Sequence, residues 1–255
     1  MKIAVCVKHA IDETELKIDS SGRPILDGAL SKMGTFDKNA VEEGLRLKAA
    51  LGGELVVVTV GKADARKSLK EALAMGADRG IHVVTDTGLL DPSKTSELLS
   101  AAISTTGPYD LVLCSEGSSD TYTGLVPAMV AEFLGLPYVG YARKLEATSQ
   151  DVKAERSLED SLETIEVPLP VVVSVVSEIN EPRYPTLIQI MQASKKPVEE
   201  LRVEQLQTES PSTAVSVVSL LAQSSNRKHI MLEGTPDEVA AKLLEALVKE
   251  GVLPA

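Results

Sequence analysis

The sequence predicts an α/β fold: a doubly wound, mainly parallel sheet with helices on both faces, an antiparallel β extension, and a C-terminal arm that carries a helix. Two observations predict the sheet. Short apolar runs rich in β-branched residues alternate with amphipathic stretches long enough for helices, and Gly76 and Gly135 stand where two of these helices would end. A chain of 255 residues can form one large domain, or a large and a small one.

Four apolar runs in the first part of the chain predict buried parallel strands. They cover residues 2–7, 54–60, 81–84 and 110–114. Helical patterns lie between and after them, at residues 36–50, 63–75, 93–105 and 123–134. In the first helix, Asp37 is the expected N-cap, and Glu42 stands four residues before Arg46, a favourable spacing for an ion pair.

After residue 140 the pattern changes to β-prone segments with charged turns and no helix between them. These segments are residues 144–149, 152–156, 162–167 and 171–176, and they predict an antiparallel extension of the same sheet. A helix is expected at residues 186–193. We therefore expect the α/β domain, with its extension, to cover residues 1–194.

The remaining residues, 195–255, are predicted to form an extended arm and a final helix. Residues 195–224 are polar and rich in serine. The helix at 235–250 has Thr235 as N-cap, Pro236 in its first turn, and an apolar stripe through Leu243, Leu244 and Leu247. This stripe needs a surface to cover it, either a partner subunit or the core of the same chain.

Charge and cysteine content exclude several classes of function. The formal net charge of −11 disfavours a nucleic acid or an anionic membrane as partner. No stretch approaches the roughly 20 apolar residues of a membrane span, so no membrane insertion is expected. Cys6 and Cys114 lie in apolar runs and are expected to be buried thiols, not disulfide or metal ligands. The chain is expected in the cytoplasm, or in the mitochondrial matrix if it is eukaryotic.

The candidate ligand site is the edge of the sheet where the strands end. In doubly wound sheets, ligands bind outside the carboxyl ends of the strands, where the strand order reverses. Three loops leave such ends here, at residues 8–13, 61–62 and 115–123. The third reads SEGSSDTYTG with Gly124, and joins glycine and hydroxyl groups to a helix start that attracts anions. It predicts a phosphate site, or else a serine-rich turn that only caps a helix.

No catalytic or metal-binding pattern is present in the sequence. His9, His82 and His229 are scattered, and the G-x-S-x-G, Walker and G-x-G-x-x-G motifs are missing. The Asp/Glu pairs fall on helical positions that are expected to face solvent. His9 is the one histidine near the expected crevice, where a hydrogen-bonding role is more consistent than a catalytic one. An enzyme that used a ligand of this crevice as its substrate would lack the residues needed to catalyse the reaction.

A second informative stretch is an apolar strand that leads into NEPRYP and then into a helix. Pro182 and Pro185 flank Arg183 and Tyr184 and restrict the backbone, as a partner-docking loop requires. An ordinary rigid turn is the alternative.

Together these segments closely resemble the β subunit of electron-transfer flavoproteins. The family motif NEPRYP, followed by I-M-x-A-x-x-K-P, is matched at residues 180–185 and 190–197. The segments VKHAID, FDKNAVEEGLRLK, ALAMGADRGIHV and EGTPDEVAAKLLEALVKEG match as well, so the resemblance spans essentially the whole chain.

The resemblance implies a heterodimer in which a larger α subunit holds most contacts to a redox FAD. The β subunit then binds an adenine nucleotide in its sheet crevice: AMP in many members, a second FAD in electron-bifurcating ones. By this resemblance, the nucleotide contacts are Cys6, Val7, Lys8, Asp37, Val58, Val60, Gly61, Ser118, Ser119, Asp120, Thr121, Tyr122 and Thr123. The docking residues are Ile179, Asn180, Glu181, Pro182, Arg183 and Tyr184, with Ile179 as an apolar anchor.

Three positions depart from the family pattern. The family's N-P before F-D is Gly34–Thr35 here, the phosphate loop is shortened to SSDTYTG, and Glu13 replaces a frequent aromatic residue. The T-G opening of the following helix resembles AMP-binding members, whereas Asp120–Thr121 resembles the D-T of bifurcating members. These residues are compatible with either AMP or a second FAD in the crevice, and of the two we expect AMP.

The implied function is that of an electron carrier, not an enzyme, unless the protein is bifurcating. It would accept electrons from flavin dehydrogenases, such as the acyl-CoA dehydrogenases of fatty acid oxidation, and pass them to a quinone oxidoreductase or another acceptor. The alternative from another class is a stand-alone regulatory protein that binds an adenine nucleotide without flavin or α subunit.

Overall fold

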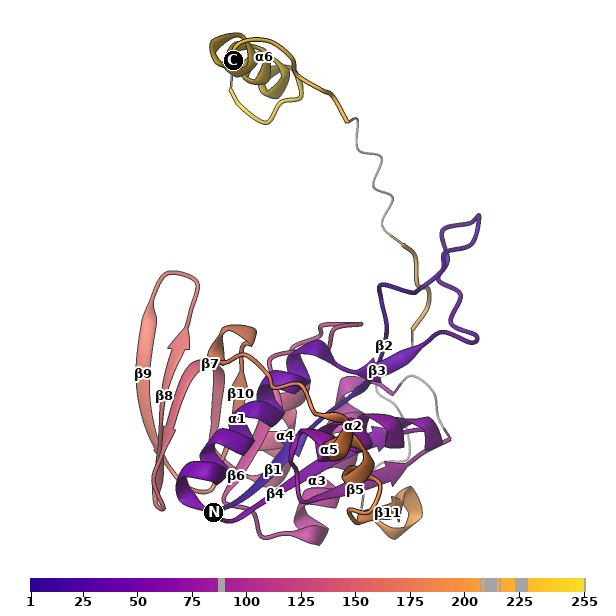
Figure 1. Cartoon of the computed structure of the whole chain (residues 1–255), viewed down its shortest axis with the longest axis vertical. Coiled ribbons are helices and arrows are strands. Elements are labelled where there is room, and N and C mark those ends of the chain that lie inside the picture. The colour runs from indigo at the N-terminus through magenta and orange to yellow at the C-terminus, as the bar shows by residue number, and fades with distance from the viewer. Residues whose placement is uncertain (87–89, 207, 209–214, 216, 223–228, 255) are drawn as a thin grey trace.

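A computed structural model of the chain describes residues 1–86, 90–206, 208, 215, 217–222 and 229–254. Their centre is a nine-stranded sheet in the order β11-β5-β4-β1-β6-β10-β7-β8-β9 (Figure 1). The strands are β1 (Lys2–Cys6), β4 (Glu54–Gly61), β5 (Arg79–Val84), β6 (Leu111–Ser115), β7 (Tyr138–Ala147), β8 (Asp151–Ser157), β9 (Leu162–Pro168), β10 (Val171–Val175) and β11 (Val198–Arg202). The four strands predicted in the first part of the chain are confirmed as β1, β4, β5 and β6.

Helices cover both faces of the sheet, as predicted. Because side chains alternate along a strand, Ile3 and Val5 of β1 face one way and Ala4 and Cys6 the other. The first pair packs in the core under α1 (Thr35–Leu51) and α2 (Arg66–Met75). The second pair packs in the core under α3 (Pro92–Thr106) and α4 (Val126–Leu134).

Two helix starts differ from the prediction. The N-cap of α1 is Gly34, which has no side-chain cap, whereas Asp37 lies within the first turn and is buried. Helix α4 begins at Val126, later than the predicted residue 123, because Gly124 adopts a positive φ of 66° and breaks the helical path.

The antiparallel extension is confirmed for β7, β8 and β9, which pair antiparallel at one edge of the sheet. The prediction that residues 171–176 belong to this extension is wrong. Residues 171–175 form β10, which lies between β6 and β7 and is parallel to both. All five residues of β10 are buried, as expected of a parallel strand covered on both faces.

Several short elements were not predicted. Strands β2 (His9–Ile11) and β3 (Ser31–Met33) form a separate antiparallel pair after β1. Strand β11 pairs parallel to β5 at the sheet edge, so the sheet continues beyond residue 194, where the arm was expected to begin. The short helices η2 (Ser177–Ile179) and η3 (Val203–Gln205) were not predicted either. The helix predicted at residues 186–193 is confirmed as α5 (Leu187–Ala193), and the one predicted at residues 63–75 is formed by η1 (Ala63–Ala65) and α2.

The C-terminal helix α6 (Pro236–Lys249) begins at Thr235, which forms the predicted N-cap as part of a capping box. Figure 1 shows α6 away from the sheet, and none of its own residues is buried. Its apolar stripe, with Leu243 and Leu244, therefore does not pack on the main core. Much of the expected arm, including residues 209–214 and 223–228, lies outside the described residues. In the described parts of the chain, no helix combines the length and apolar character needed to cross a membrane.

Candidate functional site

The strand order reverses between β1 and β6. From β1, the chain adds β4 and β5 on one side of the sheet, while β6 and β10 lie on the other side. The loops that leave β1 and β6 therefore diverge at the carboxyl ends of these strands, the position at which the sequence predicts a ligand crevice. We call this position the crevice. Side-chain contacts join Lys8 to Ser118, Asp120 and Thr121 there.

The Lys8 side chain bridges the two loops. Its ammonium nitrogen lies 2.6 Å from Asp120 Oδ1 and donates to the hydroxyl oxygens of Ser118 and Thr121, both at 3.3 Å. The other Asp120 oxygen accepts the backbone N–H of Ile11 at 3.3 Å. Burial opposes ionisation of Asp120, but the hydrogen bond and charge of Lys8 outweigh it and lower the pKa of this carboxyl. The structure thus holds an ion pair across the crevice.

Asp37 joins the same two strand ends to helix α1. Its Oδ2 accepts the backbone N–H of Lys8 at 2.7 Å, and its Oδ1 accepts the hydroxyl of Ser115. Burial raises the pKa of Asp37 to about 6, although these hydrogen bonds and the charge of Lys8 favour the ionised form. The sequence indicated Asp37 as a helix cap, but its side chain fixes the crevice loops instead.

An aromatic pair borders the crevice. The rings of Phe36 and Tyr122 meet edge to face, with centroids 5.6 Å apart. Tyr122 is about half exposed and has a positive φ of 41°, a strained conformation for a bulky residue. Its ring lies over Gly117, where an added Cβ would stand only 2.9 Å from the ring. Only glycine therefore fits at position 117.

The donor set of this crevice suits a phosphate. Lys8 supplies a partly exposed positive charge, and the hydroxyl groups of Ser118 and Thr121 surround it. The hydroxyl oxygen of Ser119 is buried and has no partner among the described residues. Thr123 is exposed and lies two residues before Leu125, the N-cap of α4, so the helix does not begin at Thr123 as predicted.

The predicted contacts deeper in the crevice differ in access. Cys6, Val7 and Val58 are buried, and the backbone N–H of Val7 already donates to Val58 O at 2.9 Å. Val60 and Gly61 are half-buried at the rim of the sheet. A ligand at this edge of the sheet would therefore reach the surface of Val60 and Gly61 more readily than the side chains of the three buried residues.

The NEPRYP loop is tied to helix α1. Asn39 donates from Nδ2 to the carbonyl oxygens of Ser177 at 3.0 Å and Asn180 at 2.8 Å. Arg183 forms a bidentate ion pair with Glu42. Glu42 and Glu43 are buried, contrary to the expectation that the Asp/Glu pairs face solvent. The sequence missed them because charged residues are usually exposed. Arg46, the expected partner of Glu42, lies near Glu43 instead.

The predicted apolar anchor, Ile179, directly precedes the NEPRYP loop. It belongs to η2, is half-buried, and packs against the core under α1. The exposed apolar side chains follow it in the chain, at Tyr184 (93% exposed), Leu187 (81%), Ile188 (67%) and Met191 (73%). We call these four residues the α5 surface. The helical pattern at 186–193 contained Leu187, Ile188 and Met191 but gave no sign of which side of the helix faces outward.

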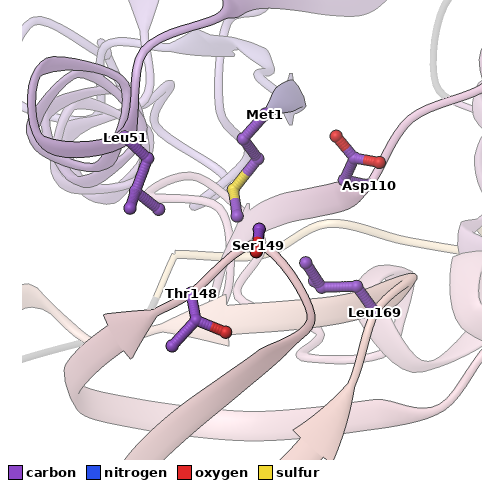
Figure 2. Close-up of a pocket in the computed structure, with 6 residues that line it drawn as sticks. All are labelled: Met1, Leu51, Asp110, Thr148, Ser149 and Leu169. Carbon is purple, nitrogen blue, oxygen red and sulfur yellow. The ribbon is translucent and has the colours of Figure 1, made fainter.

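His9 and two hollows take no part in either site. His9 Nδ1 lies 2.8 Å from the Ser68 hydroxyl, and burial lowers the pKa of this histidine. A cavity of about 200 Å³ is lined by Met1, Leu51, Asp110, Thr148, Ser149 and Leu169, as Figure 2 shows. A groove of about 410 Å³ lies beside Tyr109 and Leu136. Both hollows lie at the amino ends of the strands, opposite the crevice.

Comparison with known proteins gives a consistent result. The family model of the electron transfer flavoprotein domain matches residues 25–206. An electron transfer flavoprotein subunit beta of Thermoanaerobacterium thermosaccharolyticum is 34% identical over 99% of this chain and 100% of its own length. Proteins of the same description from Bacillus subtilis and Clostridium acetobutylicum are 33% and 32% identical, each over 98% of both chains.

Proposed function

Because this chain belongs to the electron transfer flavoprotein family, as one of its beta subunits, we propose that it is the nucleotide-binding half of a heterodimeric electron carrier. The match along almost the whole length of the beta subunits supports this role. In the proposed heterodimer, a larger subunit holds most contacts to one FAD, which supplies the redox chemistry. The residues of this chain bind and orient the nucleotide and dock the electron donors.

The observation that supports nucleotide binding best is the Lys8 side chain at the point where strand order reverses. Lys8, Ser118, Ser119 and Thr121 would hold a phosphate there, where a cation and hydroxyl donors gather between the loops after β1 and β6. Tyr122 and Thr123, on the same loop, and Val60 and Gly61, at the rim, would border the rest of the nucleotide. We propose AMP as this nucleotide.

The phosphate would have to compete with Asp120 for Lys8. The Asp120 carboxylate already pairs with the Lys8 ammonium at 2.6 Å, and its negative charge would repel an incoming phosphate. Asp120 is thus both a member of the binding loop and a limit on its affinity. If the crevice takes a second FAD instead, as in bifurcating members, the same loop would hold the pyrophosphate.

Docking of electron donors is assigned to the loop of residues 179–184 together with the α5 surface. Tyr184 stands exposed between Pro182 and Pro185, which restrict the backbone, and the other three exposed side chains follow on α5. Such rigid apolar groups are typical of the centre of a binding interface. The expected donors are flavin dehydrogenases, for example acyl-CoA dehydrogenases, and the expected acceptor is a quinone oxidoreductase. The cytoplasm is the expected location.

Helix α6 is proposed to pack on the larger subunit. Its apolar stripe has no cover within the described residues of this chain, and removal of that stripe from water would stabilise the assembly.

Coexpression with the larger subunit tests this function. The copurified heterodimer should show a flavin absorbance spectrum that a purified dehydrogenase and its substrate bleach. A chain that binds adenine nucleotide but never recruits a larger subunit or flavin would support the regulatory-protein alternative.

A further inference from the structure

Helix α1 carries buried polar side chains that serve both candidate sites. On its first turn, Asp37 accepts hydrogen bonds from the backbone of Lys8 and the hydroxyl of Ser115, which follow or end the two strands at the crevice. Further along the same helix, Asn39 and Glu42 bind the NEPRYP loop. Both sets are buried: Asp37 is 3%, Asn39 5% and Glu42 6% exposed.

The contact of Asn39 with the loop is reciprocal. Asn39 donates from Nδ2 to Asn180 O at 2.8 Å, while Asn180 donates from its own Nδ2 to Asn39 O at 3.1 Å. The Asn180 amide also donates to Glu43 Oε2 at 3.0 Å. The Asn180 side chain therefore contacts two positions of α1 that lie one helical turn apart, and a rotation of the loop would break some of these bonds.

The second contact is the ion pair between Glu42 and Arg183. Both Glu42 oxygens are used, and the backbone N–H of Arg183 donates to Oε2 at 3.2 Å as well. Glu42 is nearly inaccessible to water, so any displacement of the loop would leave a buried carboxylate without donors. Because such groups are costly to leave unpaired, the loop is held to the helix.

These contacts fix the start of the α5 surface. Tyr184 directly follows Arg183, and helix α5 begins three residues later at Leu187. Helix α5 buries only Ala193 and packs on α2. Its orientation therefore depends on α2 and on the loop that leads into it.

We propose that α1 couples the nucleotide crevice to the α5 surface, so that an adenine nucleotide in the crevice makes the α5 surface more rigid. Glu42, Arg183, Asn39 and Asn180 are the positioning residues in this coupling. The inference rests on the proposed function, because it takes the crevice as a nucleotide site and the α5 surface as a docking site. A nucleotide that restrains Lys8 and the loop after β6 also restrains Asp37, and with it the first turns of α1.

The coupling would be reciprocal. A donor protein that binds the α5 surface loses less conformational freedom when that surface is already ordered. Linkage then requires that the donor protein also tighten nucleotide binding by the same factor. The nucleotide would thus set docking affinity without contacting the donor protein.

Amide hydrogen exchange tests the proposal on the full-length chain in complex with its larger subunit. After extraction of copurified nucleotide, exchange is followed with and without saturating AMP. We expect AMP to slow exchange at residues 118–123 and also, on the order of fivefold, at residues 186–193. In Arg183→Met and in Glu42→Gln, the slowing at residues 118–123 should persist while the slowing at residues 186–193 is lost.

Two further variants complete the experiment. Arg183→Lys keeps the charge but loses the planar guanidinium, so it should retain only part of the slowing by AMP at residues 186–193. Arg156→Met breaks an ion pair of β8 and β9 with Glu163, at 2.8 Å, away from both sites, and should leave the AMP effect unchanged. Since the readout is a difference made by AMP, a general loss of stability would not imitate it.

The outcomes separate this inference from the function on which it rests. Protection by AMP at residues 118–123 without any change at residues 186–193 in the wild type would overturn the coupling and leave nucleotide binding intact. An AMP effect on α5 that survives Arg183→Met would overturn the assigned route. If equilibrium dialysis finds neither AMP nor FAD bound by the crevice, the proposed nucleotide function is wrong and the coupling falls with it.

Discussion

The guanidinium of Arg183 lies on both carboxylate oxygens of Glu42, with Nε 2.7 Å from Oε2 and Nη2 2.8 Å from Oε1. The pair joins the loop after β10 to the second turn of α1, which are far apart in the sequence. A planar fork matches a carboxylate in this way, whereas a lysine supplies only a point charge. The two proposed binding sites of the chain therefore share one helix, and each can be tested separately.

Asp37→Asn should change how stability depends on pH. The folded chain holds Asp37 with a pKa of about 6, above the ordinary value of 3.8, so it binds this proton more tightly than the unfolded chain does. The contribution of Asp37 to the free energy of unfolding is therefore highest below the unfolded pKa. It declines as pH rises toward the folded pKa, by about 3 kcal/mol in total.

Urea unfolding of both proteins between roughly pH 4 and pH 7 measures this difference. Other titrating groups contribute to both proteins and cancel in the comparison. The wild type should lose stability relative to Asp37→Asn as pH rises. Parallel profiles for the two proteins would show that the carboxyl of Asp37 is not shifted.

Lys8→Met should weaken AMP binding about 10- to 100-fold, because a charge-assisted hydrogen bond to phosphate is worth about 1.5–3 kcal/mol. Asp120→Asn should strengthen it, since the competing carboxylate is neutralised. Titration calorimetry on nucleotide-free protein gives both affinities, and Lys70→Met, which removes an exposed charge on α2, serves as control. Equal affinities in Lys8→Met and the control would exclude Lys8 as the phosphate ligand.

Much of the fold could be predicted because the strands and helices have strong local signals. Runs such as residues 54–60 are apolar and β-branched, and glycine ends α2 and α4. The place of β10 could not be predicted in this way. A fully buried strand has no alternation to show its neighbours, so only the assembled sheet reveals that it is parallel to β6 and β7.

The candidate sites were predicted less completely, for a related reason. The loops after β1 and β6 follow from topology, so Lys8 and residues 118–123 were found from the sequence. Asn39 and Glu42 were not predicted to take part in a site. Polar residues on a helix are expected to face solvent, and these two are buried because a distant loop supplies hydrogen-bonding partners. The family resemblance predicts Ile179 as an anchor, whereas in η2 its side chain is half-buried and packs against the core.

Leu187→Ala should weaken docking, whereas Ile179→Ala should lower the stability of the fold. Leu187 is 81% exposed, so its truncation should leave the melting temperature nearly unchanged while it weakens docking to a flavin dehydrogenase about 5- to 150-fold, as for a central interface residue. Ile179 packs against the core, and its truncation should cost about 1–2 kcal/mol of stability. The melting curve and the rate of flavin reduction at limiting carrier concentration measure the two effects. The expectation that Ile179 is the anchor predicts the reverse pattern.

Truncation before Thr235 should impair assembly without unfolding the α/β domain. Helix α6 buries none of its residues, so its loss removes nothing from the core. We expect the truncated chain to keep its circular dichroism spectrum and melting temperature, but to copurify poorly with the larger subunit. Full copurification would mean that α6 does not contribute to the interface.

The central claim is that this chain binds AMP while a larger subunit holds the redox FAD, and the nucleotide content of the purified heterodimer tests it most directly. Denaturation with acid, followed by chromatography of the supernatant, gives the amounts of FAD and AMP per heterodimer. We predict one FAD and one AMP. Two FAD and no AMP would contradict the AMP assignment and indicate the bifurcating class, and release of FAD alone at one per heterodimer would contradict nucleotide binding by this chain.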